Sequence, residues 1–248
     1  MPALRRAVAI LDYLSERCGG ASATDIARDL NVPKSTAHGL LVAMEELGLL
    51  IRESDGRLRT GPRSLRWAND FIAGSDLVSV FKQYFHGPHP LAGYTVTMTV
   101  LEGAEVVYIA CSHANQPLGV TFRIGMRLPA PFTATGKALL GALSEEELEQ
   151  RLGGDFPAPL TRHSVTDLAH LKQELPQLAQ RGYSIDDGET REGMTCLGTT
   201  VRDHTGQAVA GLAISLTRTE AVPDKVAELG ARLRQAAQDI SATLGAPR

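Results

Sequence analysis

Apolar and polar positions along residues 22–60 predict two short helices followed by a small hairpin. Ser22 stands three residues before Asp25, a helix-start spacing in which the two side chains cap free backbone N–H groups. The first helix then has a short apolar face, formed by Ile26, Ala27 and Leu30. Pro33 suits the first turn of the second helix, because a proline loses no hydrogen bond there.

The second helix has an apolar stripe and a polar start. The stripe, which we expect to face inward, consists of Ala37, Leu40, Leu41, Met44 and Leu47. The side chains left facing outward near its N-terminus are Lys34, Ser35, Thr36 and His38. Gly48 ends the helix, and Asp55-Gly56 is a strong hairpin signal before Arg57 and Arg59. Such a helix and basic hairpin can enter a DNA major groove and contact the phosphates beside it; the alternative is a small helical subdomain with a surface hairpin.

The flanking segments set the domain boundaries. Residues 3–17 predict a preceding helix whose inward positions include Leu4, Val8, Leu11 and Leu14. Gly61-Pro62 breaks the chain, residues 64–72 favour a connecting helix, and Gly74-Ser75 marks a boundary. We therefore expect a DNA-binding domain over residues 1–61, a linker helix over 62–75 and a second domain over 76–248.

The second domain combines strands with long helices. Strands are expected at residues 94–101, 105–111, 120–124, 183–185, 195–201 and 209–216. Helices are expected at residues 77–85, 133–142, 145–152, 168–181 and 223–244. Turn signals at residues 102–104 and 203–206 join neighbouring strands as hairpins. This order predicts an α+β domain with a mainly antiparallel sheet.

Composition narrows the class of protein. Of the 248 residues, 43% are hydrophobic and 21% are charged, which is typical of a globular protein in water. The chain has no run of 18 apolar residues and its N-terminus lacks a signal-peptide core, so we expect a cytoplasmic protein and no membrane partner. Three scattered cysteines are too few for a disulfide framework or a zinc knuckle, and we expect no cofactor.

Charge is divided unevenly along the chain, whose net charge is −3. Residues 1–74 hold ten Lys or Arg against nine Asp or Glu, and the remainder holds 15 against 19. Non-specific DNA affinity rises with the number of phosphates neutralised, so one module of this charge should bind duplex weakly. We therefore expect an oligomer that combines several modules.

Two groups of motifs resemble the IclR family of bacterial transcription regulators over almost the whole chain. The N-terminal motifs are Ala-Val-Ala-Ile-Leu-Asp at 7–12, Asp-Ile-Ala-Arg at 25–28 and Val-Pro-Lys-Ser-Thr-Ala-His at 32–38. The C-terminal motifs are Gly-Met-Arg-Leu-Pro at 125–129, Ala-Thr-Gly-Lys-Ala-Leu-Leu at 134–140, and the spaced set Gly182, Asp186, Glu189, Cys196-Leu197-Gly198, Val201 and Asp203. The chain departs from the family at Gly39, where an arginine is usual, and at Arg202, where an aromatic residue is usual.

The resemblance implies a winged helix-turn-helix, a linker helix and an effector-binding domain with a GAF-like or profilin-like sheet. It also implies a sequence-specific regulator that binds operator DNA as a homodimer or a dimer of dimers and senses a small organic acid. Two consequences of the missing arginine at position 39 stay open: a closer approach of the helix backbone to DNA, or a shift of the DNA contacts to Arg52, Arg57 and Arg59. The implied effector-binding residues are Val120, Leu128, Ala134, Thr135, Asp186, Met194, Cys196, Ala213 and Ser215.

The chemistry of these residues suits a small carboxylate. Residues 133–137 open a helix, whose free N–H groups favour an anion, and Thr135 adds a hydroxyl donor. Each residue also has an ordinary structural interpretation: Cys196 as a buried hydrophobe, Asp186 as a turn residue, Thr135 as a helix start and Met194 as core.

Two further interpretations were weighed against the regulator. His86, His89 and His113 could form a metal site, but a His pair in a Gly-Pro loop without a supporting cysteine is more often exposed to solvent. A GAF-like thiol enzyme using Cys196 needs an activating base or a second cysteine, and the spacing of Cys18 and Cys111 indicates neither. We therefore expect a regulator that is not an enzyme.

Overall fold

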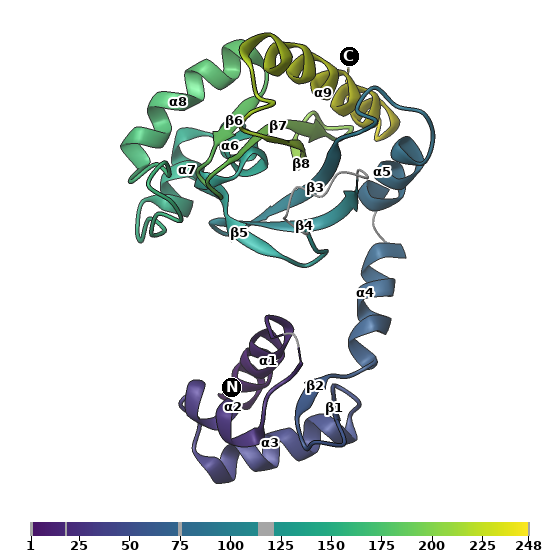
Figure 1. Cartoon of the computed structure of the whole chain (residues 1–248), viewed down its shortest axis with the longest axis vertical. Coiled ribbons are helices and arrows are strands. Elements are labelled where there is room, and N and C mark those ends of the chain that lie inside the picture. Colours follow the sequence, from purple (N-terminus) through teal and green to yellow (C-terminus); the bar gives the residue numbers. More distant parts are fainter. Residues whose placement is uncertain (1, 18, 74–75, 114–121, 248) are drawn as a thin grey trace. The chain divides into compact units, whose positions relative to one another are not determined.

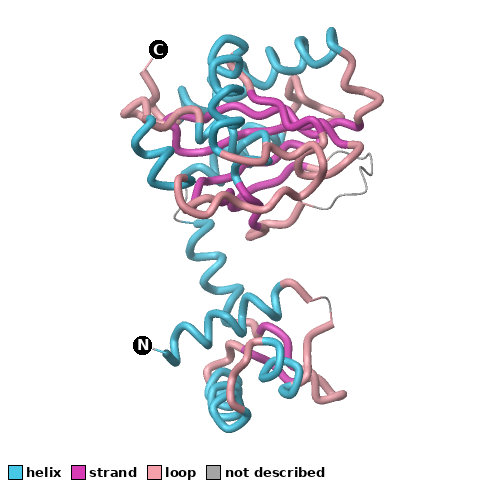
Figure 2. Tube along the Cα trace, turned by 90° about the vertical axis from the view of Figure 1, so that its left-hand side faces the viewer, coloured by secondary structure: helices cyan, strands magenta, loops and turns pink. Residues whose placement is uncertain are grey.

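A computed structural model describes residues 2–17, 19–73, 76–113 and 122–247 (Figure 1). The chain divides into two compact units, Met1–Ser75 and Asp76–Arg248. Figure 2 shows that helices dominate the first unit and that a strand-rich sheet dominates the second. Within the described residues, no helix is long and apolar enough to cross a membrane.

The first unit contains three helices, a hairpin and a fourth helix. Its elements in chain order are α1 (Pro2–Ser15), α2 (Ala23–Asp29), α3 (Lys34–Glu46), β1 (Leu50–Arg52), β2 (Leu58–Thr60) and α4 (Arg63–Ala73). Ser22 Oγ accepts a hydrogen bond from Asp25 N at 3.1 Å, so the predicted helix start is confirmed. The two strands pair antiparallel around Gly56, whose φ is +81°. The small core is made by Ile10, Leu14, Ile26, Leu41, Met44, Leu50 and Leu58.

Three residues expected to face this core lie outside it. Leu4 is 63% exposed, Val8 is 49% exposed and Leu47 is 53% exposed, so these predictions were wrong. On α1 the buried positions are Leu14, as predicted, and Ile10 one helical turn before it. Leu47 caps the C-terminus of α3, where its side chain leaves the apolar stripe.

The second unit is an α+β domain, as predicted. Its helices are α5 (Asp76–His86), α6 (Ala134–Leu140), α7 (Glu145–Leu152), α8 (Leu168–Arg181) and α9 (Pro223–Thr243), with a 3-10 turn η1 (Ala130–Phe132). Its strands are β3 (Thr95–Glu102), β4 (Glu105–Ser112), β5 (Arg127–Pro129), β6 (Ser184–Asp187), β7 (Met194–Arg202) and β8 (Ala208–Thr217). The strands form one antiparallel sheet in the order β5-β4-β3-β8-β7-β6.

Close packing places α6 directly on the sheet. A Cβ atom at Gly198 would lie 2.4 Å from the backbone of Ala134, and one at Gly211 would lie 2.6 Å from Thr135 Cβ. Glycine at these two positions therefore lets the start of α6 touch β7 and β8. Helix α9 packs against β7 as well.

Two details of the sheet differ from the prediction. Residues 120–121 of the expected strand at 120–124 lie outside the described residues, and Phe122–Ile124 are not in a strand. Residues 127–129, which were not among the expected strands, form the short edge strand β5, because Glu105–Val107 of β4 offers them a free edge. The predicted bounds of α7 and α8 agree with the structure.

Candidate functional site

The start of α3 presents a polar surface. Lys34, Ser35 and His38 are exposed, and Thr36 is half-buried. Ala37, Leu41 and Met44 anchor the opposite side of the helix in the core. A Cβ atom at Gly39 would meet no heavy atom within 4 Å, so this position is open as well. The four predicted α3 residues therefore lie in the first two turns of the helix, three of them exposed to solvent.

The hairpin arginines are less alike than the sequence suggested. Arg52 donates to Glu45 through Nε at 3.0 Å and Nη2 at 2.7 Å, and Arg59 forms an ion pair with Glu53. The Arg57 guanidinium instead donates to the Gly19 carbonyl at 3.3 Å and has no carboxylate partner within the described part of the hairpin unit. Exposed ion pairs of this kind contribute little, about 0–1 kcal/mol, so a phosphate can replace either glutamate.

A cavity of about 170 Å³ lies against the face of the sheet that carries α6. The predicted effector residues that the structure brings together around it are Leu128, Ala134, Thr135, Asp186, Met194, Cys196, Ala213 and Ser215. Val120, the remaining predicted residue, lies outside the described residues. Cys196 and Ser215 are cross-strand partners, and their Sγ and Oγ atoms are 3.4 Å apart.

Seven lining residues were missed by the sequence analysis, namely Thr97, Tyr108, Phe122, Met126, Thr133, Thr190 and Arg191. The rings of Tyr108 and Phe122 stack with centroids 5.3 Å apart, which gives the cavity an aromatic wall. Thr97 pairs directly with Ala213 on β8, so the register of the sheet could have found it. Arg191 adds a guanidinium group to the lining. It could have been identified from the sequence, because it stands two residues after Glu189 of the family motif.

Asp186 both lines the cavity and holds the turn that follows β6. Its Oδ1 accepts hydrogen bonds from Glu189 N at 2.7 Å and Thr190 N at 3.2 Å. Burial raises the pKa of this carboxyl group, although the hydrogen bonds from Thr190 and Glu189 oppose the shift. Thr190 Oγ1 in turn donates to the Phe132 carbonyl at 2.8 Å. The turn interpretation of Asp186 is therefore correct, and it coexists with a position in the cavity wall.

A buried lysine ties this turn to α6. Lys137 Nζ donates to Glu189 and, at 2.5 Å, to Glu174 on α8. The side chains of Lys137 and Glu189 are 3% and 7% exposed, whereas that of Glu174 is 42% exposed. Burial raises the pKa of Glu189 to about 7 despite the lysine. Val165 N donates to the second Glu189 oxygen at 3.3 Å, so the carboxyl group has partners on both sides.

The helix that was expected to attract an anion is short. It runs only from Ala134 to Leu140, and Thr133 Oγ1 already accepts from Gly136 N at 3.0 Å. A seven-residue helix has a weaker dipole than the predicted ten-residue one. The polar groups that the wall itself adds to this cavity are the hydroxyl groups of Thr135 and Ser215 and the guanidinium of Arg191.

Neither described cysteine is activated. Burial raises the pKa of Cys196 to about 12, and burial also raises the pKa of Cys111 to about 11. Cys111 Sγ lies 3.6 Å from His113 Nδ1, a contact that the sequence did not predict. Because both thiols are protonated at neutral pH, the geometry supplies no thiolate nucleophile at either position. Cys18 lies outside the described residues.

Two family models match this chain. The IclR helix-turn-helix domain matches residues 3–54, and the bacterial transcriptional regulator IclR C-terminal domain matches residues 70–242. The HTH-type transcriptional repressor AllR of Salmonella typhimurium is 31% identical over 244 residues, which cover 98% of this chain and 90% of that protein.

Two solved structures are similar over nearly the whole chain. The repressor BlcR of Agobacterium tumefaciens is 53% identical with a TM-score of 0.67, covering 100% of this chain and 99% of that one. An IclR homolog of Microbacterium hydrocarbonoxydans, complexed with 4-hydroxybenzoate, is 26% identical with a TM-score of 0.79, covering 98% of both chains.

Proposed function

The chain belongs to the IclR family of bacterial transcription regulators, and we propose that it is a repressor whose affinity for its operator is either lowered or raised by a small carboxylic acid. It has a helix-turn-helix DNA-binding domain and a C-terminal ligand-binding domain. Relatives named as repressors support the direction of regulation. The observation that carries the effector half of the proposal is the cavity of about 170 Å³ beside Cys196.

On the DNA side, α3 is the proposed reader and the hairpin contacts the backbone. Lys34 and Thr36 lie at the start of α3, where a recognition helix meets base edges and phosphates. Arg57 is the hairpin arginine best placed for a phosphate, since Arg52 and Arg59 have glutamate partners. Binding should weaken steeply as salt rises, because each phosphate contact releases counterions.

On the ligand side, the cavity favours a compact acid with an unsaturated or aromatic body. Its volume of about 170 Å³ is below the roughly 300–1,000 Å³ typical of sites for drug-sized ligands. The stacked Tyr108 and Phe122 rings suit a flat apolar group, while Thr135, Ser215 and Arg191 suit a carboxylate. The homolog complexed with 4-hydroxybenzoate supports this class of ligand.

The start of α4 is attached to the end of the recognition helix. Arg63 Nη1 donates to the Leu47 carbonyl at 2.8 Å, and Arg63 N donates to the Gly48 carbonyl at 3.3 Å. A displacement of α4 is therefore passed to α3 through these bonds. The effector changes DNA affinity only if it binds one arrangement of the regulator better than another.

Exposed apolar side chains on the first unit support a homodimer. Leu4 and Val8 on α1, and Leu65 and Trp67 on α4, are between 49% and 64% exposed. A second copy of the chain would cover these side chains and would add a second recognition helix for the other half-site. Sedimentation of the purified protein tests this part of the proposal.

A pair of crossed variants tests the proposed function. Lys34→Ala should weaken binding to promoter DNA and leave the thermal shift given by a carboxylic acid such as 4-hydroxybenzoate unchanged. Thr135→Val, which removes one hydroxyl group and keeps the side-chain shape, should do the reverse. Equal effects of both variants on both readouts, or no effect of either, would contradict the division of roles.

A further inference from the structure

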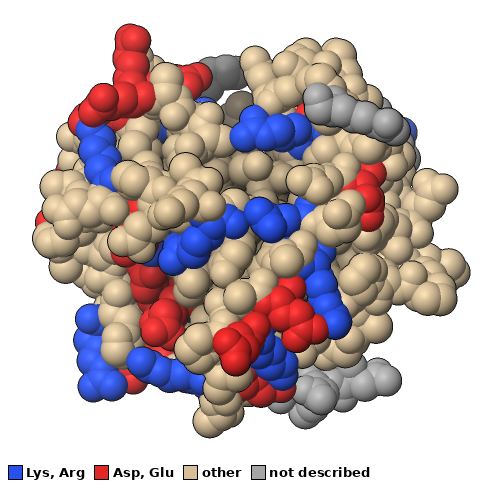
Figure 3. Space-filling view, turned by 90° about the horizontal axis from the view of Figure 1, so that it is seen from above, with Lys and Arg blue, Asp and Glu red and all other residues tan. Residues whose placement is uncertain are grey.

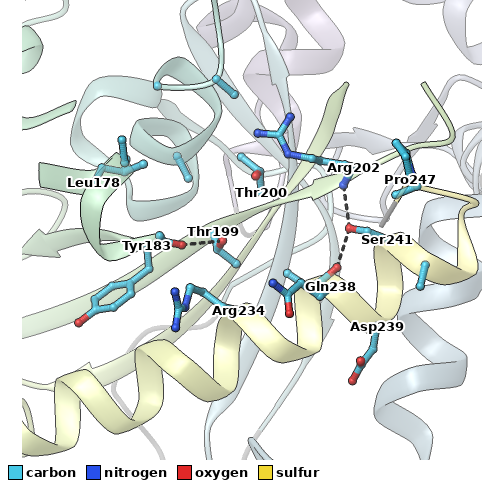
Figure 4. Close-up of a pocket in the computed structure, with 18 residues that line it drawn as sticks. Leu178, Tyr183, Thr199, Thr200, Arg202, Arg234, Gln238, Asp239, Ser241 and Pro247 are labelled. Atoms are coloured by element: carbon cyan, nitrogen blue, oxygen red, sulfur yellow. Dashed lines mark hydrogen bonds between the residues drawn. The ribbon is translucent and has the colours of Figure 1, made fainter. Parts of the chain in front are cut away.

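The second unit has another hollow besides the cavity beside Cys196. It is a wider groove of about 790 Å³ between α6, α8 and α9 (Figure 4). The groove exists because β6 pairs only with Thr195–Gly198 of β7, while β7 continues to Arg202. The outer edge of β7 beyond Gly198 is therefore left without a neighbouring strand, and the groove lies along it.

The charged groups in this groove are mainly arginines. Arg202 comes from β7 and Arg234 from α9, and Figure 4 shows them on two sides of the hollow. Arg181, at the end of α8, lies next to it: its guanidinium is 5.7 Å from the centre of the Tyr183 ring that lines the groove. Figure 3 shows Lys and Arg side chains running across this face beside a hollow.

Within the described residues, no ion pair joins these arginines to a carboxylate. The Arg202 guanidinium donates to the Gly206 carbonyl at 2.7 Å. Arg181 Nε is buried and has no hydrogen-bond partner in the described residues. Arg234 forms no ion pair within those residues either. The guanidinium groups of Arg202 and Arg234 therefore have no carboxylate partner to displace before an anion binds in the groove.

A glycine leaves room for the side chain of Arg234. Gly182 ends α8 with φ +76°, and a Cβ atom there would lie 2.7 Å from Arg234 Cδ. The absence of a side chain at residue 182 therefore lets the stem of Arg234 pass close to the end of α8.

The acidic residue in the groove wall does not neutralise these cations. Asp239 Oδ2 accepts from Tyr84 Oη at 2.9 Å, and its Oδ1 accepts from Gln235 at 2.9 Å. Figure 4 shows its carboxylate pointing away from Arg202 and Arg234. The groove is therefore locally positive in a domain with more acidic than basic residues.

We propose that this groove is a second ligand site, which binds a small organic dianion between Arg234 and Arg202. Two guanidinium groups on separate walls match two acidic groups on one molecule, since each can form a forked pair with a carboxylate. Thr200 and Gln238 add polar groups between them. The C-terminal part of α6 lines this groove and its first residues line the smaller cavity, so one helix touches both sites.

Calorimetric titration of the full chain with malonate, succinate, glutarate and adipate tests the proposal. At least one of these dicarboxylates should bind, and Arg234→Gln and Arg202→Gln should each raise its Kd about tenfold or more. Arg232→Gln is the matched control, because Arg232 lies on the same helix and pairs with Glu228. Arg232→Gln, and Thr135→Val in the smaller cavity, should leave the Kd unchanged.

Three results would overturn the proposal. One is the absence of binding by every dicarboxylate at millimolar concentration. Another is a Kd that responds to Thr135→Val and not to Arg234→Gln, because the dianion would then occupy the smaller cavity. The third is a change in sedimentation caused by Arg234→Gln while dicarboxylate binding stays intact, which would make the groove an interface between copies. If the second ligand site is refuted, the proposed regulator function still stands, because it is tested separately with Lys34→Ala and 4-hydroxybenzoate.

Discussion

Replacing Lys137 by Met should destabilise the second unit strongly. Removing the charge of Glu174, the more exposed of its two carboxylate partners, should not. The lysine is 3% exposed and contacts Glu189, which is 7% exposed, and Glu174, which is 42% exposed. Without Lys137, Glu189 keeps the N–H of Val165, at 3.3 Å, as the hydrogen-bond donor to its carboxyl oxygens. The buried carboxyl group must then remain charged without a cation or take up a proton.

Breaking a buried ion pair by removing one partner costs about 3–5 kcal/mol. In a domain of this size each kcal/mol lowers the melting temperature by roughly 2–4 °C, so Lys137→Met should lower it by roughly 6–20 °C. Glu174→Gln is the matched control, because it removes a half-exposed partner of the same lysine and should cost less than about 1 kcal/mol. The double variant Lys137→Met, Glu189→Leu should recover most of the loss, since no unpaired charge remains.

Thermal unfolding of the full chain, followed by circular dichroism at pH 7, measures all three variants. The reasoning is refuted if Glu174→Gln costs as much as Lys137→Met, or if the double variant is no more stable than Lys137→Met alone. Because Glu189 belongs to the turn that includes Asp186 and Thr190, Lys137→Met should also weaken binding of a carboxylic acid in the smaller cavity.

Three other predictions follow from burial and backbone conformation. Gly39→Ala should raise the stability of the first unit by about 1 kcal/mol in thermal unfolding, because the position is helical and open; a loss of stability would contradict this. Cys196 should resist a thiol reagent such as DTNB at pH 8 until the protein is unfolded, because burial raises its pKa to about 12; rapid labelling of the folded protein would show an exposed or activated thiol. The pKa of Glu189 rises from 4.5 to about 7 on folding, so its contribution to stability is present below pH 4.5 and is lost as the pH rises through about 7. Unfolding free energies measured between pH 4 and 8 should therefore depend less on pH in Glu189→Gln than in the parent protein.

Local signals in the sequence were enough to predict the bounds of helices that begin or end at clear capping residues. Ser144 and Glu147 form a full capping box at the start of α7, and Gly182 in the left-handed region ends α8. Both helices have the predicted bounds, because these signals act within a few residues of the chain. The short edge strand β5 could not be found in this way, since it is a strand only through its pairing with β4.

The cavity was only partly visible in the sequence. Family motifs gave the residues on α6, β7 and β8, but Thr97 and Tyr108 on β3 and β4 were missed. Thr95–Thr99 of β3 are all buried, so no alternation of polar and apolar residues shows which side chains face the cavity. The Lys137 pairs were equally hidden, because the two glutamates stand 37 and 52 positions along the chain from the lysine.

The arginines of the hairpin show a further limit. Composition and spacing made Arg52, Arg57 and Arg59 equivalent candidates for phosphate contacts. The structure gives two of them glutamate partners, because Glu45 on α3 and Glu53 in the hairpin lie within reach. The side-chain partners of exposed charges depend on tertiary packing and turn geometry, which the sequence pattern does not encode.

Fluorescence anisotropy of a labelled promoter fragment from beside the gene tests the central claim most directly. The protein is titrated onto the DNA with and without the carboxylic acid that gives the largest thermal shift. We predict that the acid changes the Kd for DNA several-fold in the parent protein and has no effect in Thr135→Val, which still binds the fragment normally. An identical Kd with and without the acid in the parent protein, or an undiminished response in Thr135→Val, would contradict a regulator controlled from the cavity beside Cys196.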